Sequence, residues 1–187
     1  MNCGRVLAAV IAAGVLQAGV ALAAEPVVAP PHDVTHVENA SDWCAAHASR
    51  YEMIQAMSDC DYAVAMAPNK AKALSNRGAV WLMAREPGKA AADFSDAILL
   101  SPEDATLNFN RGIAYGMIGA RDKAIAEYTD ALKKRPTMAI ALYNRGYEYE
   151  LLGRSTEALE DYRRALSLEP QLKPASDAIQ RVTKGRL

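Results

Sequence analysis

The sequence has almost no net charge and few aromatic residues. Its 21 basic residues are balanced by 22 acidic ones, and aromatic side chains account for 6% of the chain. No basic stripe with interleaved aromatics occurs, which argues against a nucleic-acid partner. The sequence also lacks a phosphate-binding loop, paired Cys-x-x-Cys motifs and a Ser-His-Asp or Cys-His-Asn set on an evident scaffold. We therefore expect no enzyme, no cofactor and no metal.

The beginning of the chain has the composition of an export signal. Arg5 supplies the positive charge, residues 6–20 form an apolar stretch, and Ala23 completes a cleavage site of small residues. We expect residues 1–23 to be removed as a signal peptide and the mature chain to reside in the periplasm, without membrane contact. Secretion is an alternative, and so is retention of the apolar stretch as a membrane anchor. Cys3 precedes the apolar stretch, which is not the arrangement of a lipoprotein.

A proline-rich segment follows the signal. Residues 24–36 contain three prolines and are predicted to form an extended linker. His32 and His36 have the spacing of two zinc ligands on one helix face. The neighbouring prolines favour a solvated linker instead, so we expect no metal there.

The rest of the chain is built on a repeat of 34 residues. Prolines and the tripeptide Asn-Arg-Gly recur with this period, and so do columns of small and aromatic residues. So many columns in one register indicate a repeat architecture. The recurring positions are Pro68, Pro102, Pro136 and Pro170; Asn76, Asn110 and Asn144, each followed by Arg-Gly; Trp81, Tyr115 and Tyr149; Ala90, Ala124 and Ala158; Phe94, Tyr128 and Tyr162; and Ala97, Ala131 and Ala165.

Each repeat predicts a pair of helices. In the unit 105–138, Gly112 and Tyr115 fall at helical spacing in a first segment, and Tyr128 belongs to a second. Gly119 lies between them, where a residue without Cβ can end a helix with positive φ. Each recurring proline ends the second helix because it cannot continue the hydrogen-bond ladder. One pair cannot bury its apolar face, so neighbouring pairs must stack into an all-α solenoid.

The order Gly, aromatic, Ala, aromatic, Ala and Pro in a 34-residue period resembles the tetratricopeptide repeat, here of an exported bacterial type. The resemblance is strong over three units and weaker in the first, whose columns hold Cys44, His47 and Cys60 in place of the glycine and both aromatics. It implies about four units and a C-terminal cap with one polar side. The implied boundaries are a degenerate unit 37–70, full units 71–104, 105–138 and 139–172, and a capping helix and tail 173–187.

Arg77, Arg111 and Arg145 stand where the family usually has leucine. A stripe of three arginines could bind anions, but the acidic residues of these units outnumber them. We therefore predict that each arginine stem packs between repeats and that its guanidinium pairs with a neighbouring acid. The candidate acids are Asp93, Asp96, Glu127, Asp130 and Asp161.

Signal cleavage leaves Cys44 and Cys60 as the two cysteines of the chain. An even pair in an exported protein favours a disulfide. The family resemblance places both residues in columns that face each other within one helix pair, so a bond there would stabilise the degenerate unit by about 3 kcal/mol. Two free buried thiols are an alternative. A redox or metal module built on Cys44, Cys60 and His47 is another.

The resemblance also implies where a partner binds. First helices of this family line a concave groove, and the asparagine column faces into it. A row of amides can pair with an extended peptide backbone, although asparagine in this column also serves helix-to-helix bonding. Aromatic side chains beside the row would anchor a partner. The predicted groove residues are Lys72, Ser75, Asn76, Phe109, Asn110, Ile113, Tyr143, Asn144 and Tyr147.

These features predict a periplasmic scaffold that binds another protein or an extended peptide, in envelope assembly or secretion. Some family members clamp a terminal carboxylate between lysine, arginine and asparagine. Only Lys72 and the asparagine column match that set here, so this specificity is not expected. The alternative is a structural protein that associates with itself and leaves the groove idle.

Overall fold

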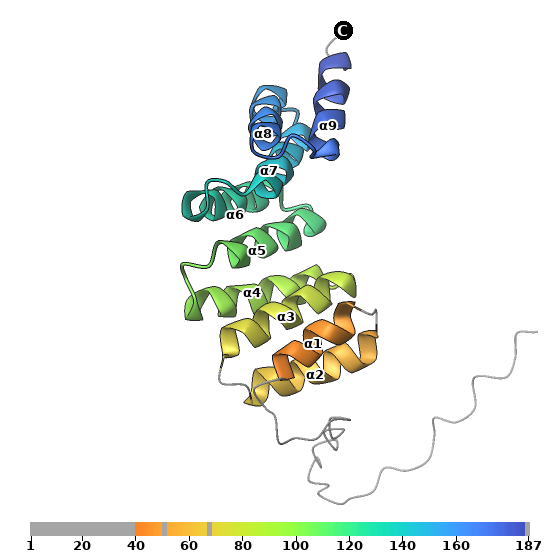
Figure 1. Cartoon of the computed structure of the whole chain (residues 1–187), viewed down its shortest axis with the longest axis vertical. Helices are drawn as coiled ribbons and strands as arrows, with labels where there is room; N and C mark the ends of the chain where they lie inside the picture. The colour runs from red at the N-terminus through yellow and green to blue at the C-terminus, as the bar shows by residue number, and fades with distance from the viewer. Residues whose placement is uncertain (1–39, 50–51, 67–68, 186–187) are drawn as a thin grey trace, which may run out of the picture.

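The structure is a computed structural model, and it describes residues 40–49, 52–66 and 69–185. Within these ranges the chain has nine α-helices and no strand, which confirms the all-α solenoid (Figure 1). None of the described helices is both long and apolar enough to span a bilayer. The predicted signal peptide 1–23 and linker 24–36, with His32 and His36, lie outside the described residues.

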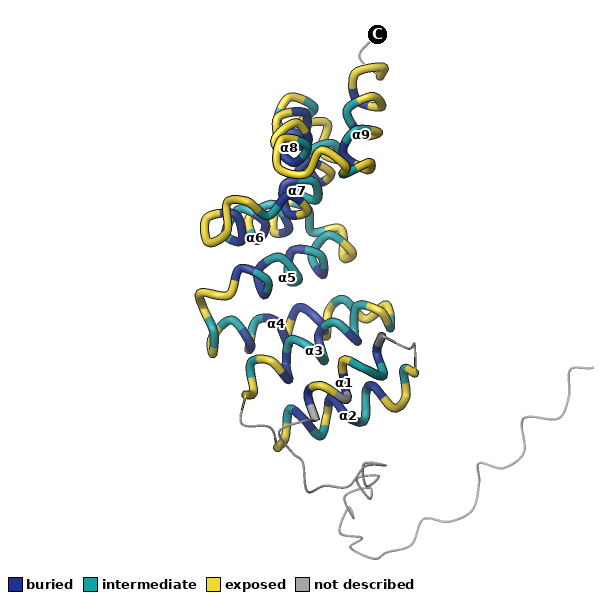
Figure 2. The backbone as a smooth tube through the Cα atoms, in the orientation of Figure 1, coloured by how far each residue is buried: buried dark blue, intermediate teal, exposed yellow. Residues whose placement is uncertain are grey.

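Consecutive helices pair and the pairs stack in chain order, from α1 and α2 at one end to α9 at the other (Figure 1). Buried residues follow the faces where helices meet, and exposed ones lie on the turns and outer faces (Figure 2). The pairs are α1 (Ala40–Ser49) with α2 (Met53–Met66), α3 (Lys70–Met83) with α4 (Pro87–Leu100), α5 (Ala105–Ile118) with α6 (Arg121–Lys134), and α7 (Ala139–Leu151) with α8 (Ser155–Leu168); α9 is Lys173–Lys184.

The turn within each full unit uses a left-handed residue. Gly119 ends α5 with φ of 83°, which confirms its predicted role, and Gly153 has φ of 74° after α7. Glycine adopts this conformation without a steric penalty because it has no Cβ. In the turn after α3 the same column holds Arg85, which has φ of 62°. That turn is therefore formed at some steric cost.

Small residues bring the two helices of each full unit together. A Cβ built on Gly112 would lie 2.6 Å from the ring of Tyr128, closer than carbon atoms can approach. Gly78 meets Phe94 in the same way, and Gly146 meets Tyr162. The three rings are almost completely buried. The glycine and aromatic columns therefore form one repeated packing element, with the ring filling the space that the glycine leaves.

Each arginine of the repeating tripeptide pairs with an acid 16 residues later, in the second helix of its own unit. Both hydrogen bonds from Arg145 to Asp161 are 2.8 Å long. These contacts confirm the predicted pairing of the arginines. The bond to the acid raises the pKa of Arg77 and of Arg145 above the ordinary value. The pairs are Arg77 with Asp93, Arg111 with Glu127, and Arg145 with Asp161.

The same arginines also reach back into the preceding unit. Arg145 Nη1 donates to Thr129 Oγ1 at 3.0 Å, and Arg111 Nη1 donates to Ser95 Oγ at 3.0 Å. Arg77 contacts Asp61 at 2.9 Å. Each partner lies 16 residues before its arginine. Each guanidinium thereby joins three helices across the boundary between two units.

The terminal helix α9 covers the end of the stack. It buries Ala175, Ala178 and Val182, and its other residues are half-buried or exposed, as expected of a cap. Arg181 donates to both carboxylate oxygens of Glu150 on α7, at 2.7 and 2.9 Å. The buried Tyr162 donates its hydroxyl hydrogen to the same carboxylate. Arg181 thereby lowers the pKa of Glu150, and burial opposes this shift.

Replacing Arg181 by glutamine is expected to destabilise the chain by about 0.5 kcal/mol at pH 7, since half of the arginine side chain is exposed and solvent screens the pair. A lowered folded-state pKa of Glu150 contributes stability above the ordinary carboxyl pKa of 4.5, and this contribution disappears as the pH falls through the folded-state value. Urea unfolding at pH 7 and pH 3 measures the difference. An equal loss at both pH values would contradict the ionic origin.

Candidate functional site

A pocket of about 450 Å³ lies between the first helices of the last two units, α5 and α7. Its lining residues come mostly from the carboxyl-terminal halves of these helices, and α6 contributes two more. The pocket is an open depression in the surface and not an enclosed cavity. The lining residues are Ile113, Gly116, Met117, Arg121, Tyr128, Asn144, Tyr147, Glu148 and Leu151. We call this site the α5–α7 pocket.

Apolar side chains form the walls of the α5–α7 pocket. Met117, Tyr147 and Leu151 are 40%, 42% and 44% exposed, which is unusual for large apolar side chains grouped in one place. Two neighbouring residues, Ile118 and Leu152, are also exposed. Grouped exposed apolar residues of this kind mark surfaces that bind a partner.

The polar groups of the pocket centre on a buried carboxylate. Arg121 Nη1 donates to Glu148 Oε2 at 3.0 Å, and the Glu148 side chain is only 7% exposed. A Cβ on Gly116 would lie 2.6 Å from Glu148 Oε1, so the absence of a side chain there makes room for the carboxylate. Burial raises the pKa of Tyr128, and the charge of Glu148 raises it further, while a contact from Asn144 opposes the shift. The Tyr128 hydroxyl therefore stays protonated at neutral pH.

Three of the predicted groove residues, Ile113, Asn144 and Tyr147, meet in the α5–α7 pocket. The half-buried Asn110 side chain forms no hydrogen bond within the described part of the chain, and Ser75 is half-buried. Whether these residues bind a peptide stays a prediction.

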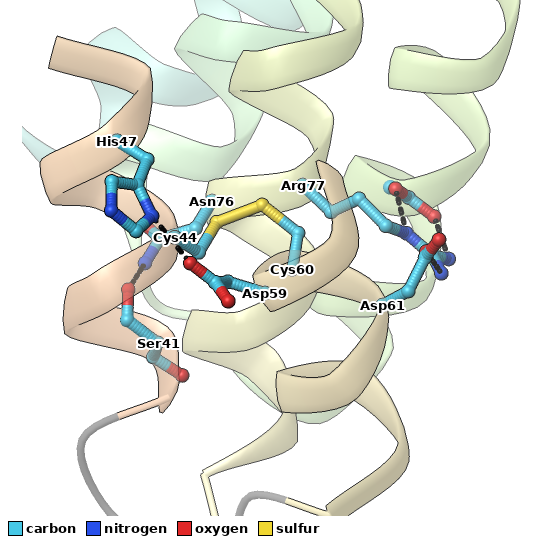
Figure 3. The surroundings of a disulfide bond; sticks show 9 residues. Ser41, Cys44, His47, Asp59, Cys60, Asp61, Asn76 and Arg77 are labelled. Atoms are coloured by element: carbon cyan, nitrogen blue, oxygen red, sulfur yellow. Dashed lines mark hydrogen bonds and ion pairs between the residues drawn. A yellow bond between two sulfur atoms is a disulfide. The ribbon is translucent and has the colours of Figure 1, made fainter. Parts of the chain in front are cut away.

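Two other predicted groove residues are engaged by the first unit. Lys72 Nζ lies 2.6 Å from Asp42 Oδ1 on α1. Asn76 Nδ2 donates to the Ser41 carbonyl oxygen at 2.6 Å (Figure 3). This asparagine therefore serves helix-to-helix bonding, which was one of the two roles considered for its column.

The two aromatic residues Phe109 and Tyr143 pack against the rings of the second helices. The ring centroids of Phe109 and Tyr128 are 5.9 Å apart, and those of Tyr143 and Tyr162 are 5.7 Å apart. Both side chains also pack against a buried cluster that joins Leu132 of the third unit to Leu142 of the last. They are half-buried, and neither lines the α5–α7 pocket, so their predicted role in the groove stays a prediction.

Sequence reasoning missed Gly116, Met117, Arg121, Tyr128, Glu148 and Leu151 as pocket residues. One signal could have revealed part of this set: Met83, Met117 and Leu151 form an apolar column at the 34-residue period. The structure shows all three exposed at the ends of the first helices. An exposed apolar column is not needed for the core, so it indicates a contact surface.

In the first unit, a disulfide replaces the glycine–aromatic packing. Cys44 and Cys60 stand in the glycine and aromatic columns and are bonded, with Cα atoms 4.9 Å apart and both residues fully buried (Figure 3). His47 Nδ1 lies 2.5 Å from Oδ2 of the buried Asp59. Across the described ranges, no group of three or more His, Cys, Asp or Glu side chains is placed to hold a metal.

A stack of helix pairs with an apolar-walled pocket between successive first helices defines an α-solenoid scaffold for protein interaction. The model of the tetratricopeptide repeat matches residues 139–172. A solved tetratricopeptide-repeat domain, that of OM64 from Arabidopsis, is 31% identical and aligns over 61% of this chain and 94% of that domain, with a TM-score of 0.60. The chain belongs to the tetratricopeptide-repeat family.

Two further solved structures are similar. A crystal structure of MamA has a TM-score of 0.70 at 21% identity, covering 76% of this chain and 84% of that one. The second tetratricopeptide-repeat domain of human RPAP3, solved with an HSP70 peptide, has a TM-score of 0.57 at 25% identity, covering 59% of this chain and 92% of that one. No curated protein matches the chain by sequence.

Proposed function

We propose that the chain is an exported, periplasmic scaffold that holds an extended segment of another envelope protein, in assembly or secretion. The observation that carries this proposal is the α5–α7 pocket, where large apolar side chains stay exposed around a polar floor. Exposed apolar area of this kind is stabilised by covering it with a partner. A pocket between helices suits a side chain that projects from an extended peptide.

The proposed location is supported by two features of the sequence and structure. The first 23 residues have the charge, apolar stretch and small residues of an export signal. The buried Cys44–Cys60 bond is of a kind that persists in oxidising compartments such as the periplasm and is rare in the cytosol.

The proposed ligand class is supported by solved relatives. The RPAP3 domain with the HSP70 peptide SGPTIEEVD is one tetratricopeptide-repeat structure with a bound peptide. Acidic peptides of that kind need basic groups in the groove. Here Lys72 is paired with Asp42, and Arg121 is paired with Glu148. We therefore propose a segment of low charge as the ligand of this chain.

Crosslinking and capture from native envelope tests the proposal. The double variant Met117→Ala/Tyr147→Ala removes two exposed walls of the pocket and is expected to lose at least about 90% of partner capture, which corresponds to about 1.4 kcal/mol. The matched control is Ile54→Ala/Leu99→Ala, which removes two apolar residues that are 82% and 81% exposed elsewhere. Melting temperatures of both variants should stay close to that of the parent.

Two results would contradict the proposal. Equal capture by the parent and the pocket variant would mean that the pocket is not the working surface. If the chain captures only further copies of itself, the alternative of a self-associating structural protein is supported instead.

A further inference from the structure

A glutamate occupies a core position of the repeat in the last unit. The column that contains Glu148 holds Val80 in the second unit and Ala114 in the third, and both of these are fully buried. Glu148 is equally enclosed, with 5% of the residue exposed. A carboxylate in a column that otherwise completes the core is costly unless it is paired. Glu148 therefore departs from the repeat and depends on a partner of its own.

Two more departures from the repeat meet this glutamate. Arg121, its partner, begins α6 at a position where the other full units have Pro87 and Ser155. Gly116, which makes room for the carboxylate, lies in a column with Leu82 and Glu150. All three residues line the α5–α7 pocket. Three independent departures that converge on one pocket indicate a site with its own chemistry.

One oxygen of the Glu148 carboxylate is left for a ligand. Oε2 accepts the hydrogen bond from Arg121. Oε1 accepts none from any residue that the structure describes, and it lies beside Gly116 at the pocket. Because Arg121 neutralises the carboxylate, the pocket has an acceptor without a net charge. A ligand group that donates a hydrogen bond and carries no charge fits this arrangement.

The side chains that form the walls of the α5–α7 pocket indicate which kind of ligand group fits there. Met117 and Tyr147 offer a thioether and a ring, and both bind aromatic rings favourably. Ile113 and Leu151 add aliphatic surface. The walls therefore fit a large flat ring.

We propose that the α5–α7 pocket is a recognition subsite for a tyrosine or tryptophan side chain in the bound segment. The ring lies between Met117 and Tyr147, and its O–H or N–H donates to Glu148 Oε1. This inference deepens the proposed function and rests on it. Because the Glu148–Arg121 pair has no net charge, the pocket offers a charged ligand group no net attraction, and burying such a group there would cost its hydration.

Methyl NMR of the purified chain tests the subsite. The probes are capped pentapeptides Ser-Ala-X-Ala-Ser, in which X is Tyr, Trp, Phe, Lys or Glu. We expect the Tyr and Trp peptides to shift the Met117 methyl signal saturably while the Met83 signal, from the same column on α3, stays unchanged. The Phe peptide is expected to bind about tenfold more weakly, because it leaves the buried acceptor unpaired.

Two substitutions distinguish the hydrogen bond from the ligand to Glu148 Oε1 from apolar contact with the pocket walls. Glu148→Gln is expected to reduce Tyr binding several-fold and leave Phe binding unchanged. Gly116→Ala places a methyl group against Glu148 Oε1 and is expected to abolish binding of both peptides. Gly88→Ala is the matched control, since a Cβ there meets nothing within 4 Å. Unchanged helicity and melting temperature show that each variant is folded.

The inference is overturned if no Tyr or Trp peptide moves the Met117 signal, if Phe binds as tightly as Tyr, or if the Lys or Glu peptide binds best. Failure of the subsite can be told apart from failure of the proposed function. Partner capture that persists when no pentapeptide binds would refute the subsite alone. Pentapeptide binding without any captured envelope partner would refute the proposed function alone.

Discussion

Replacing Cys44 and Cys60 together by alanine is expected to destabilise the first unit by about 3 kcal/mol, because the disulfide closes a loop of 16 residues in the unfolded chain. Both cysteines are fully buried between α1 and α2, so the variant also loses packing in the same place. Repeat units depend mainly on their neighbours, and the loss should stay local. Hydrogen exchange should accelerate on α1 and α2 and remain slow on α5 to α8.

A rescue variant checks the physical reason. Cys44→Gly/Cys60→Phe introduces the pair that the next unit uses, in which Gly78 lies against the buried ring of Phe94. We expect this variant to recover at least half of the lost protection of α1 and α2. If α1 and α2 are no better protected from hydrogen exchange in this variant than in the alanine variant, the first unit cannot adopt the packing of the other units. Reduction of the parent protein should reproduce the alanine result.

Replacing Arg145 by leucine, the residue that the family usually has there, is expected to destabilise the last unit by about 3 kcal/mol. The substitution leaves Asp161 without its main partner, and this residue is only 4% exposed. It also removes the bond to Thr129, which joins the unit to the preceding one. Urea unfolding followed by circular dichroism, with hydrogen exchange of α7 and α8, measures the loss.

The double variant Arg145→Leu/Asp161→Ala tests whether the loss comes from a stranded charge. A buried ion pair can often be replaced by apolar residues at little cost, whereas removing one partner is expensive. We therefore expect the double variant to be more stable than Arg145→Leu alone. A double variant that is less stable would mean that packing of the arginine stem, and not its charge, stabilises the unit.

Sequence periodicity predicted most of the fold because the repeat is a local property. The columns that place Gly112 against Tyr128 and end α5 at Gly119 lie within one unit of 34 residues. Pairing of the arginines followed from the excess of acids on the same units. Such contacts recur, so each unit provides independent support for the same interpretation.

The α5–α7 pocket could not be predicted in the same way, because it depends on departures from the repeat. Glu148 and Arg121 are 27 residues apart and belong to different units. Glycine is required at position 116 because the Glu148 carboxylate occupies the space where a side chain would lie. Side chains that occur once in a repeat protein carry no periodic signal, so their meeting point becomes visible only in three dimensions.

The first unit shows a second limit of sequence reasoning. Asp59 stands in the acid column of Asp93, but position 43 in the arginine column is a tryptophan. In the structure His47, from the aromatic column, contacts Asp59 instead, and Asp59 Oδ1 is left without a partner. The replacement comes from a different column, so alignment of the repeats does not reveal it.

Lys72 and Asn76 are engaged by α1 and are therefore not available to a partner. This shortens the part of the groove that can contact a bound peptide. The open positions lie on α5 and α7, the two first helices that flank the α5–α7 pocket. A peptide that contacts only these two helices has a short footprint. A footprint this short buries far less than the roughly 1,200 Å² typical of stable complexes. A bound peptide should therefore dissociate quickly. The fraction of time that the groove is occupied would then depend on the local concentration of the partner, which tethering raises.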